Sequence, residues 1–208
     1  MVRDKIGQYG YPIHRHDKPT SGVLLFALSK EIARMMTDIF KARETKKEYL
    51  AIVRGYTVEH ELIDYPLKEQ LDKMTDAKAN QDKEAQPAVT EYERLGTVEI
   101  PYAVGRYPVA RYSLLKLRPK TGRKHQIRRH MKHIFHPIVG DTTHGRTEHN
   151  NLFRAKLDCH RLLLHASSLG FKHPVNKEQI TIAAPLDETF IKIVNKFGWQ
   201  EILLKFID

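Results

Sequence analysis

The stretch from His14 to Leu28 reads HRHDKPTSGVLLFAL and joins a charged loop to an apolar run. Its first half places the carboxylate of Asp17 among histidines, an arginine and a lysine, and Pro19 and Gly22 prevent a regular helix there. The apolar run at residues 23–28 is short and predicts a buried strand. The sequence therefore predicts a loop that carries Asp17 and leads directly into a strand.

The elements expected after this strand follow an irregular order. Apolar residues at helical spacing predict a helix over residues 30–43, capped by Ser29. The expected strands outnumber the helices and do not alternate with them regularly, which is typical of an α+β fold with a largely antiparallel or mixed sheet. Further strands are expected at residues 49–53, 61–65, 89–95, 111–117, 160–169 and 179–184, and further helices at residues 123–135 and 188–197.

One domain is expected to include all of residues 1–208, because no linker rich in proline, glycine and serine divides the chain. Residues 68–87 differ from the rest in having mostly charged and amide side chains. This composition predicts a polar insertion or a long hairpin arm, and we expect it to be mobile.

The composition limits the classes of protein to which the chain belongs. Lysine and arginine number 35 against 25 aspartates and glutamates, and the resulting net charge of +10 indicates either a polyanionic partner or a merely soluble basic surface. Cys159 is the single cysteine, which excludes an intramolecular disulfide and a cysteine-based zinc site. No apolar run approaches the roughly 18 residues of a membrane span, so we expect a cytoplasmic protein without membrane contact.

A strongly basic segment at residues 121–133 reads TGRKHQIRRHMKH. Ile127, Met131 and Ile134 form a narrow apolar stripe on the expected helix, and its other faces are almost entirely cationic. Repulsion among these cations costs stability unless anions are near, so the segment favours contact with phosphates. The alternative is a solvated basic face without a partner.

Two single residues in these segments are also compatible with purely structural roles. Taken alone, Asp17 is typical of a turn aspartate that accepts local backbone hydrogen bonds. Tyr49, which follows two lysines and a glutamate at the start of an expected strand, is typical of core or edge packing. Spacing alone therefore leaves both residues without an assigned function.

A metal site formed by histidines is a further alternative. The sequence contains no HExxH pattern, Pro137 would end a ligand-bearing helix, and nearby arginines and lysines would repel a divalent cation. We therefore expect no metal site among the candidate ligands, which are His130, His133, His136, Asp141 and His144.

Three segments taken together resemble the RluA branch of the pseudouridine synthases. Residues 14–22 resemble the family motif H-R-L-D-x-x-T-S-G, residues 47–49 the motif K-x-Y, and residues 122–128 the motif G-R-x-H-Q-[IL]-R. Residues 161–166 and the pair at 173–174 resemble the later L-H-A and H-P elements. The resemblance implies the catalytic fold of that family, an α+β fold whose mixed, mostly antiparallel sheet has helices and loops around a central cleft.

This resemblance implies that the chain isomerises a uridine in RNA to pseudouridine without a cofactor. Asp17 would act on the ribose, either as a nucleophile at C1′ or as a base that removes the 2′ proton. Arg128 would pair with Asp17, and Tyr49 would stack on the target uracil and be available to take its C5 proton. The residues that the resemblance implies in RNA binding are Arg15, Lys47, Arg123, Lys124, Arg129 and Lys132.

Further segments resemble the branch of the family that modifies uridine 65 of transfer RNA, on the T-stem side. They are residues 19–25, 51–55, 86–90 and 197–199. The implied partner is therefore transfer RNA, bound by a monomer whose catalytic domain and polar insertion recognise the RNA.

The chain departs from the family pattern in two places. His16 and Lys18 stand where the motif usually has leucine and arginine, and protonation of His16 would lower activity below about pH 6.5. An upstream Asn-Lys-Pro-x-Gly segment is also missing, which puts one strand of the sheet in doubt. Truncation, a misassigned start and real loss are the alternatives, and a non-catalytic RNA-binding remnant of a synthase is the rival function.

Overall fold

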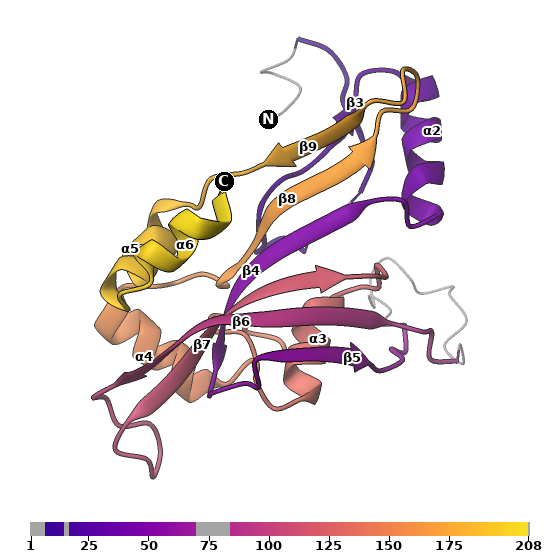
Figure 1. The fold of residues 1–208 in the computed structure, drawn as a ribbon. Coiled ribbons are helices and arrows are strands. Elements are labelled where there is room, and N and C mark those ends of the chain that lie inside the picture. Colours follow the sequence, from indigo (N-terminus) through magenta and orange to yellow (C-terminus); the bar gives the residue numbers. More distant parts are fainter. Residues whose placement is uncertain (1–6, 15–16, 70–83, 208) are drawn as a thin grey trace.

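The computed structural model describes residues 7–14, 17–69 and 84–207, and its centre is a seven-stranded sheet (Figure 1). Hydrogen-bonded neighbours follow the order β2-β8-β4-β7-β6-β5, and β9 also pairs with β8. The pair β2 and β8 is parallel and the other pairs are antiparallel. The strands are β2 (Ser21–Gly22), β4 (Lys46–Arg54), β5 (His60–Asp64), β6 (Val89–Ile100), β7 (Ala110–Pro119), β8 (Leu164–Lys172) and β9 (Gln179–Ala183).

Helices flank this sheet, and a two-stranded ribbon lies next to it. The ribbon pairs β1 (Tyr11–Pro12) with β3 (Phe26–Ala27). The helices are α2 (Lys30–Lys41), α3 (Gln126–His133), α4 (Thr147–Leu157), α5 (Glu188–Lys196) and α6 (Gln200–Ile207). The predicted α+β fold with a mixed, mostly antiparallel sheet is confirmed. None of these described helices combines the length and the apolar composition that a membrane span requires.

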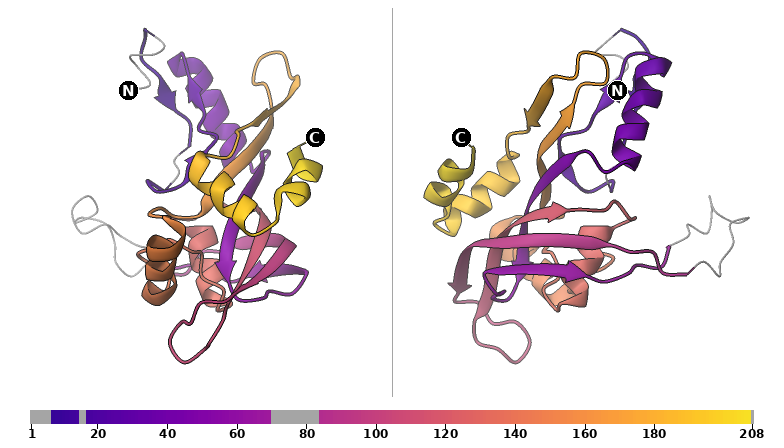
Figure 2. Two further views of the ribbon diagram at one scale, coloured as in Figure 1. Left: turned by 90° about the vertical axis from the view of Figure 1, so that its left-hand side faces the viewer. Right: turned by 45° about the vertical axis from the view of Figure 1, so that its right-hand side comes forward.

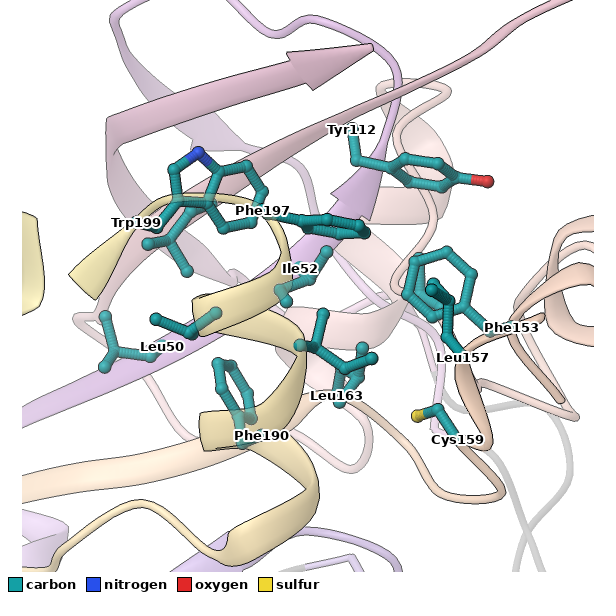
Figure 3. Packing of buried hydrophobic residues seen from close by; sticks show 14 of the residues in the cluster. Leu50, Ile52, Tyr112, Phe153, Leu157, Cys159, Leu163, Phe190, Phe197 and Trp199 are labelled. Atoms are coloured by element: carbon teal, nitrogen blue, oxygen red, sulfur yellow. The ribbon is translucent and has the colours of Figure 1, made fainter. Parts of the chain in front are cut away.

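The central strand β4 divides the core in two because successive side chains of a strand point to opposite faces. Leu50 and Ile52 point toward α4 and α5, in a cluster rich in aromatic rings that Figure 3 shows. Ala51 and Val53 belong to the opposite cluster, which includes Ile127 and Met131 of α3. The apolar stripe predicted for the basic helix is therefore confirmed, and it fastens α3 to the sheet.

The run at residues 23–28, predicted to be one buried strand, is not one. The chain pairs with β8 at β2, leaves the sheet, and then pairs with β1 at β3. Leu24 is consequently 45% exposed, whereas Val23 packs with Met36 of α2 in a third apolar cluster. The prediction was wrong because an apolar run indicates that its side chains are buried, but it does not indicate which strand each part of the run pairs with.

The other predicted elements agree with the structure to different degrees. Helix α2 confirms the prediction for residues 30–43, and α3 is shorter than predicted because His125 has a positive φ of 56° just before it. The β6–β7 hairpin extends further into the segment expected to be a loop, and α4 and α6 had no counterpart in the prediction.

The polar insertion expected at residues 68–87 falls mostly on residues 70–83, outside the described part of the chain. At its base, Leu67 and Gln86 form an antiparallel bridge with backbone hydrogen bonds of 2.9 and 3.0 Å. The two ends of the insertion therefore lie side by side. The predicted mobility concerns residues that the structure does not describe.

Gly22 holds the end of the Asp17 loop against β8. Its φ is 110°, and a Cβ atom built there would lie 2.1 Å from the carbonyl oxygen of Ala166. We therefore expect Gly22→Ala to lower the free energy of unfolding by about 3 kcal/mol or more, because strain and a backbone clash combine. Urea denaturation measures this loss.

Gly105 offers a matched control, because its φ is also positive, at 59°, but its Cβ would meet nothing within 4 Å. Gly105→Ala should cost only about 1–2 kcal/mol, the effect of a left-handed backbone alone. Equal losses for the two variants would contradict the close approach of β2 to β8.

Candidate active site

Asp17 lies in a turn that leads into β2, with its backbone oxygen accepting a 2.8 Å hydrogen bond from the amide of Thr20. Its carboxylate Oδ2 accepts a 3.2 Å hydrogen bond from Nη1 of Arg128. Its Oδ1 lies 3.6 Å from Nε2 of His125. The Asp17 side chain is 20% exposed, so part of it remains accessible to solvent.

Arg128 joins Asp17 to a second carboxylate, that of Asp141. The guanidinium donates from Nε and Nη2 to the two oxygens of Asp141 at 2.7 and 2.8 Å. These two side chains are only 4% and 1% exposed. A planar guanidinium bound at two points cannot rotate freely, so the N–H that reaches Asp17 has a defined direction.

Asp141 is fixed by the backbone around it. Burial opposes its ionisation, but hydrogen bonds from Arg128 and from the amides of Thr143 and His144 outweigh this effect and lower its pKa. Asn150 of α4 braces the segment, donating to the Asp141 carbonyl at 2.9 Å and accepting from the Gly140 amide at 2.8 Å. Asp141 and Asn150 therefore support Arg128, a role that was not predicted for either residue.

His125 and His144 form a pair next to Asp17. Nδ1 of His125 lies 3.0 Å from Nε2 of His144, so one ring donates to the other. Burial lowers the pKa of both rings, that of His144 to about 4. The pair is therefore neutral at neutral pH and adds no positive charge next to Asp17.

Tyr49 and Lys47 reach the site from β4. Tyr49 is in register with Ala166 of β8, and Gly22 pairs with the same residue from the other side, so one strand separates Tyr49 from the Asp17 loop. Burial, together with the charge of Asp17, raises the pKa of the Tyr49 phenol. Nζ of Lys47 donates to the Thr121 carbonyl at 3.3 Å. The structure thus brings together Asp17, Tyr49 and Arg128, the three residues predicted to be catalytic.

Gln126 explains how α3 presents Arg128. Its Oε1 accepts from the Thr121 hydroxyl at 2.7 Å and from the Arg123 amide at 3.0 Å. Its Nε2 donates to the carbonyl of Val89 and the hydroxyl of Thr90 at 2.9 and 3.0 Å. This side chain joins the start of α3 to β6, and Arg128 follows half a turn later, facing Asp17.

A second polar network fixes the β2 end of the Asp17 loop. Arg161 donates to the Ser21 hydroxyl at 2.8 Å and forms an ion pair with Asp187. The Ser21 hydroxyl lies 2.7 Å from Nδ1 of His165, whose Nε2 lies 3.1 Å from the Ala184 carbonyl. Ser21, Arg161 and His165 all lie in segments that carried the resemblance, but their joint position was not predicted.

The predicted RNA-binding residues differ in how much they are available to an RNA. Arg15 lies outside the described residues, as does His16. Lys124 and Lys132 are exposed, whereas burial of Arg129 lowers its pKa. The cationic surface of α3 is narrower than the sequence predicted, because Gln126, Arg128 and His130 turn inward.

The histidines considered as metal ligands are engaged in other contacts. His130 bonds to the Thr90 hydroxyl and the Tyr65 carbonyl at 2.9 and 3.0 Å, and the His133 ring stacks on Tyr65. His136 donates to the Arg54 carbonyl at 2.8 Å. Within residues 7–14, 17–69 and 84–207, no group of three or more histidine, cysteine or acidic side chains is placed to hold a metal ion.

Comparison with known proteins identifies the family of the chain. The family model of RNA pseudouridylate synthase matches residues 2–133. The tRNA pseudouridine synthase C of Haemophilus influenzae is 57% identical over 201 residues, which are 97% of this chain and 84% of that protein. The protein of the same name from Vibrio cholerae is 55% identical over 203 residues, covering 98% of this chain and 83% of its own.

A solved structure has a fold similar to that of this chain. Human RNA pseudouridylate synthase domain containing 1 aligns with a TM-score of 0.69 and 26% sequence identity, over 89% of this chain and 72% of that one. The fold and the family that the three motifs implied are thereby confirmed. The chain belongs to the RNA pseudouridylate synthase family.

Proposed function

We propose that this protein converts a uridine of transfer RNA to pseudouridine, and that the target is uridine 65 on the T-stem side. Relatives at 57% and 55% identity carry the name tRNA pseudouridine synthase C, which supports transfer RNA as the substrate. The target position is supported by the resemblance of residues 19–25, 51–55, 86–90 and 197–199 to the branch that modifies this uridine.

The placement of Asp17 is the observation that carries the proposed chemistry. The reaction breaks the bond from uracil N1 to the ribose, turns the uracil, and joins its C5 to the same ribose carbon, while C5 loses a proton and N1 gains one. Asp17 acts on the ribose, by attack at C1′ or by removal of the 2′ proton, and either role needs a carboxylate oxygen held in a fixed direction. The two hydrogen bonds from Arg128 to Asp141 support this role, because they orient the Arg128 N–H group that donates to Asp17.

Tyr49 stacks on the uracil in this proposal. The raised pKa of its phenol keeps the hydroxyl protonated at neutral pH, which makes it a poor base for the C5 proton and favours stacking. A base inside a stem is out of reach of Asp17, so the target nucleotide must be turned out of its stack at a cost of a few kcal/mol. Stacking on Tyr49 offsets part of that cost.

The cations proposed to hold the RNA backbone are those that the sequence predicted. Exposure of Lys124 and Lys132 supports direct contact with phosphates. Arg15, which lies outside the described residues, contacts the backbone or fills the gap left by the flipped nucleotide. The remaining proposed contacts are Lys47, Arg123 and Arg129.

Mapping of pseudouridine in tRNA transcripts tests the proposed function. We expect wild-type protein to form one pseudouridine, at position 65, and a matched transcript with a cytidine there and a compensating partner base should stay unmodified. Product at another uridine would leave the reaction standing and refute the position. No product despite tight tRNA binding would favour a non-catalytic RNA-binding remnant.

A further inference from the structure

A cavity of about 250 Å³ lies where β4 ends, beside the last turn of α3 and the first of α4. The end of β4, the end of α3 and the start of α4 bring residues from distant parts of the chain together here. Both views of Figure 2 place α3 and α4 in the lower part of the molecule, away from α2. Arg54, Lys132 and Arg146 line the cavity, as do His144 and Phe135. None of the catalytic residues Asp17, Tyr49 and Arg128 lines it.

The three cations at this cavity have no acidic partner in the described part of the chain. Among the described residues, Arg54, Lys132 and Arg146 form no ion pair, whereas Arg118 on β7 is surrounded by three glutamates. Like charges around one space repel each other, and a bound anion removes that repulsion. Burial, assisted by the charges of Arg54 and Arg146, lowers the pKa of the adjacent His149 to about 4.

Phe135 is unusual in both its backbone and its exposure. The amide of Phe135 donates to the Lys132 carbonyl and that of His136 to the Met131 carbonyl, the pattern that ends many helices with a glycine in the left-handed region. Phenylalanine occupies the glycine position here with a φ of 66°, and it is 79% exposed. A bulky residue is strained there and its ring gains little packing, so the ring is free for a ligand.

The cavity is connected to the catalytic carboxylate through two histidines. His144 lines the cavity and bonds to His125 at 3.0 Å, and Nε2 of His125 lies 3.6 Å from Asp17. Two side chains therefore separate the cavity from Asp17, a separation that one RNA molecule can span. The volume is below the roughly 300–1,000 Å³ typical of sites for drug-sized ligands, which suits one phosphate and part of a nucleoside.

We propose that this cavity binds one nucleotide of the RNA substrate other than the target uridine. Its backbone phosphate lies among Arg54, Lys132 and Arg146, and its unpaired base stacks on Phe135. Cations and an aromatic ring side by side are the combination with which proteins hold single-stranded nucleic acid. This proposal rests on the proposed function, because it takes RNA to be the substrate.

Phe135→Gly separates a binding role of the ring from a structural one. Glycine relieves the left-handed strain, so we expect the melting temperature to rise. Loss of the stacked base should at the same time weaken the affinity for tRNA about five- to a hundredfold. A variant with unchanged tRNA affinity would overturn the stacking part of the proposal.

Arg146→Ala tests the phosphate contact through its salt dependence. Loss of one contact should reduce the slope of log affinity against log salt by about 0.7–0.9, because one fewer counterion is released. Arg154→Ala is the matched control, since Arg154 is exposed on the same helix, outside the cavity, and its loss changes the net charge equally. Equal slopes for the two variants would refute the phosphate site.

The two proposals fail in distinguishable ways. Weaker tRNA binding by Phe135→Gly and Arg146→Ala, with no pseudouridine formed by the wild type, would support the nucleotide site and refute the proposed reaction. Normal product formation by the wild type, with affinities and salt slopes of both variants equal to those of Arg154→Ala, would refute the site and leave the reaction standing.

Discussion

Asp17→Asn is expected to reduce pseudouridine formation by about a thousandfold or more. Asparagine keeps the size of the side chain and its carbonyl oxygen still accepts the hydrogen bond from Arg128, so the loop should keep its position. The amide is neither a nucleophile nor a base for the ribose, so both proposed roles of Asp17 disappear. Single-turnover assays with saturating enzyme measure the chemical step without interference from binding.

The affinity of Asp17→Asn for tRNA should stay within about threefold of wild type, because the attraction to RNA comes chiefly from cations. Asp38→Asn is the matched control, since Asp38 is an exposed carboxylate on α2 whose nearby partner is Lys41. That control should retain full activity. A turnover rate for Asp17→Asn close to that of the control would exclude Asp17 as the catalytic carboxylate.

Arg128→Met is expected to lower the free energy of unfolding by about 3–5 kcal/mol. Methionine removes both hydrogen bonds to Asp141 and leaves that carboxylate buried without a cation. The matched control is Arg111→Met, because Arg111 and Glu99 also lie 2.7 Å apart but are about half exposed. An exposed pair should contribute less than about 1 kcal/mol, so comparable losses would contradict the buried role of Arg128.

The double variant Arg128→Met with Asp141→Asn separates the structural role of Arg128 from its role in the reaction, because asparagine can still accept the hydrogen bonds from the amides of Thr143 and His144. Removing both charges leaves no unpaired ion in the core, so much of the stability should return. Activity should not return, because Asp17 still lacks the donor that orients it. Recovery of both properties would show that Arg128 acts only through folding.

The site residues that the sequence predicted are those that belong to short motifs in a fixed order along the chain. Asp17, Tyr49 and Arg128 were named from three such segments, and the structure places them together around β2, β4 and α3. The supporting residues Asp141, Asn150 and Gln126 were not predicted to hold Arg128. Their role depends on contacts between distant segments, which spacing along one segment does not report.

Periodicity predicted the apolar stripe of α3 because side chains three and four residues apart share a face of any helix. It failed at residues 23–28, where the apolar side chains belong to two short strands with different partners. It also missed α4, whose sequence is mostly polar. Two contacts hold this helix in place: Asn150 donates a hydrogen bond to the Asp141 carbonyl, and Phe153 packs in the core. Tertiary packing, more than propensity, stabilises a helix of this kind.

By itself the sequence determined the family and the α+β class, and it predicted Asp17 as the central carboxylate, because motif order and local burial patterns are properties of the chain. Only the tertiary structure decided that Arg128 bridges two carboxylates and that Arg54, Lys132 and Arg146 share one cavity. These residues are far apart along the chain, and Asp17 and Arg128 are 111 positions apart. Pairing of the strands and packing of α3 against the sheet bring them together. The effects of burial and of charge–charge interaction that define the site arise only once the residues are close.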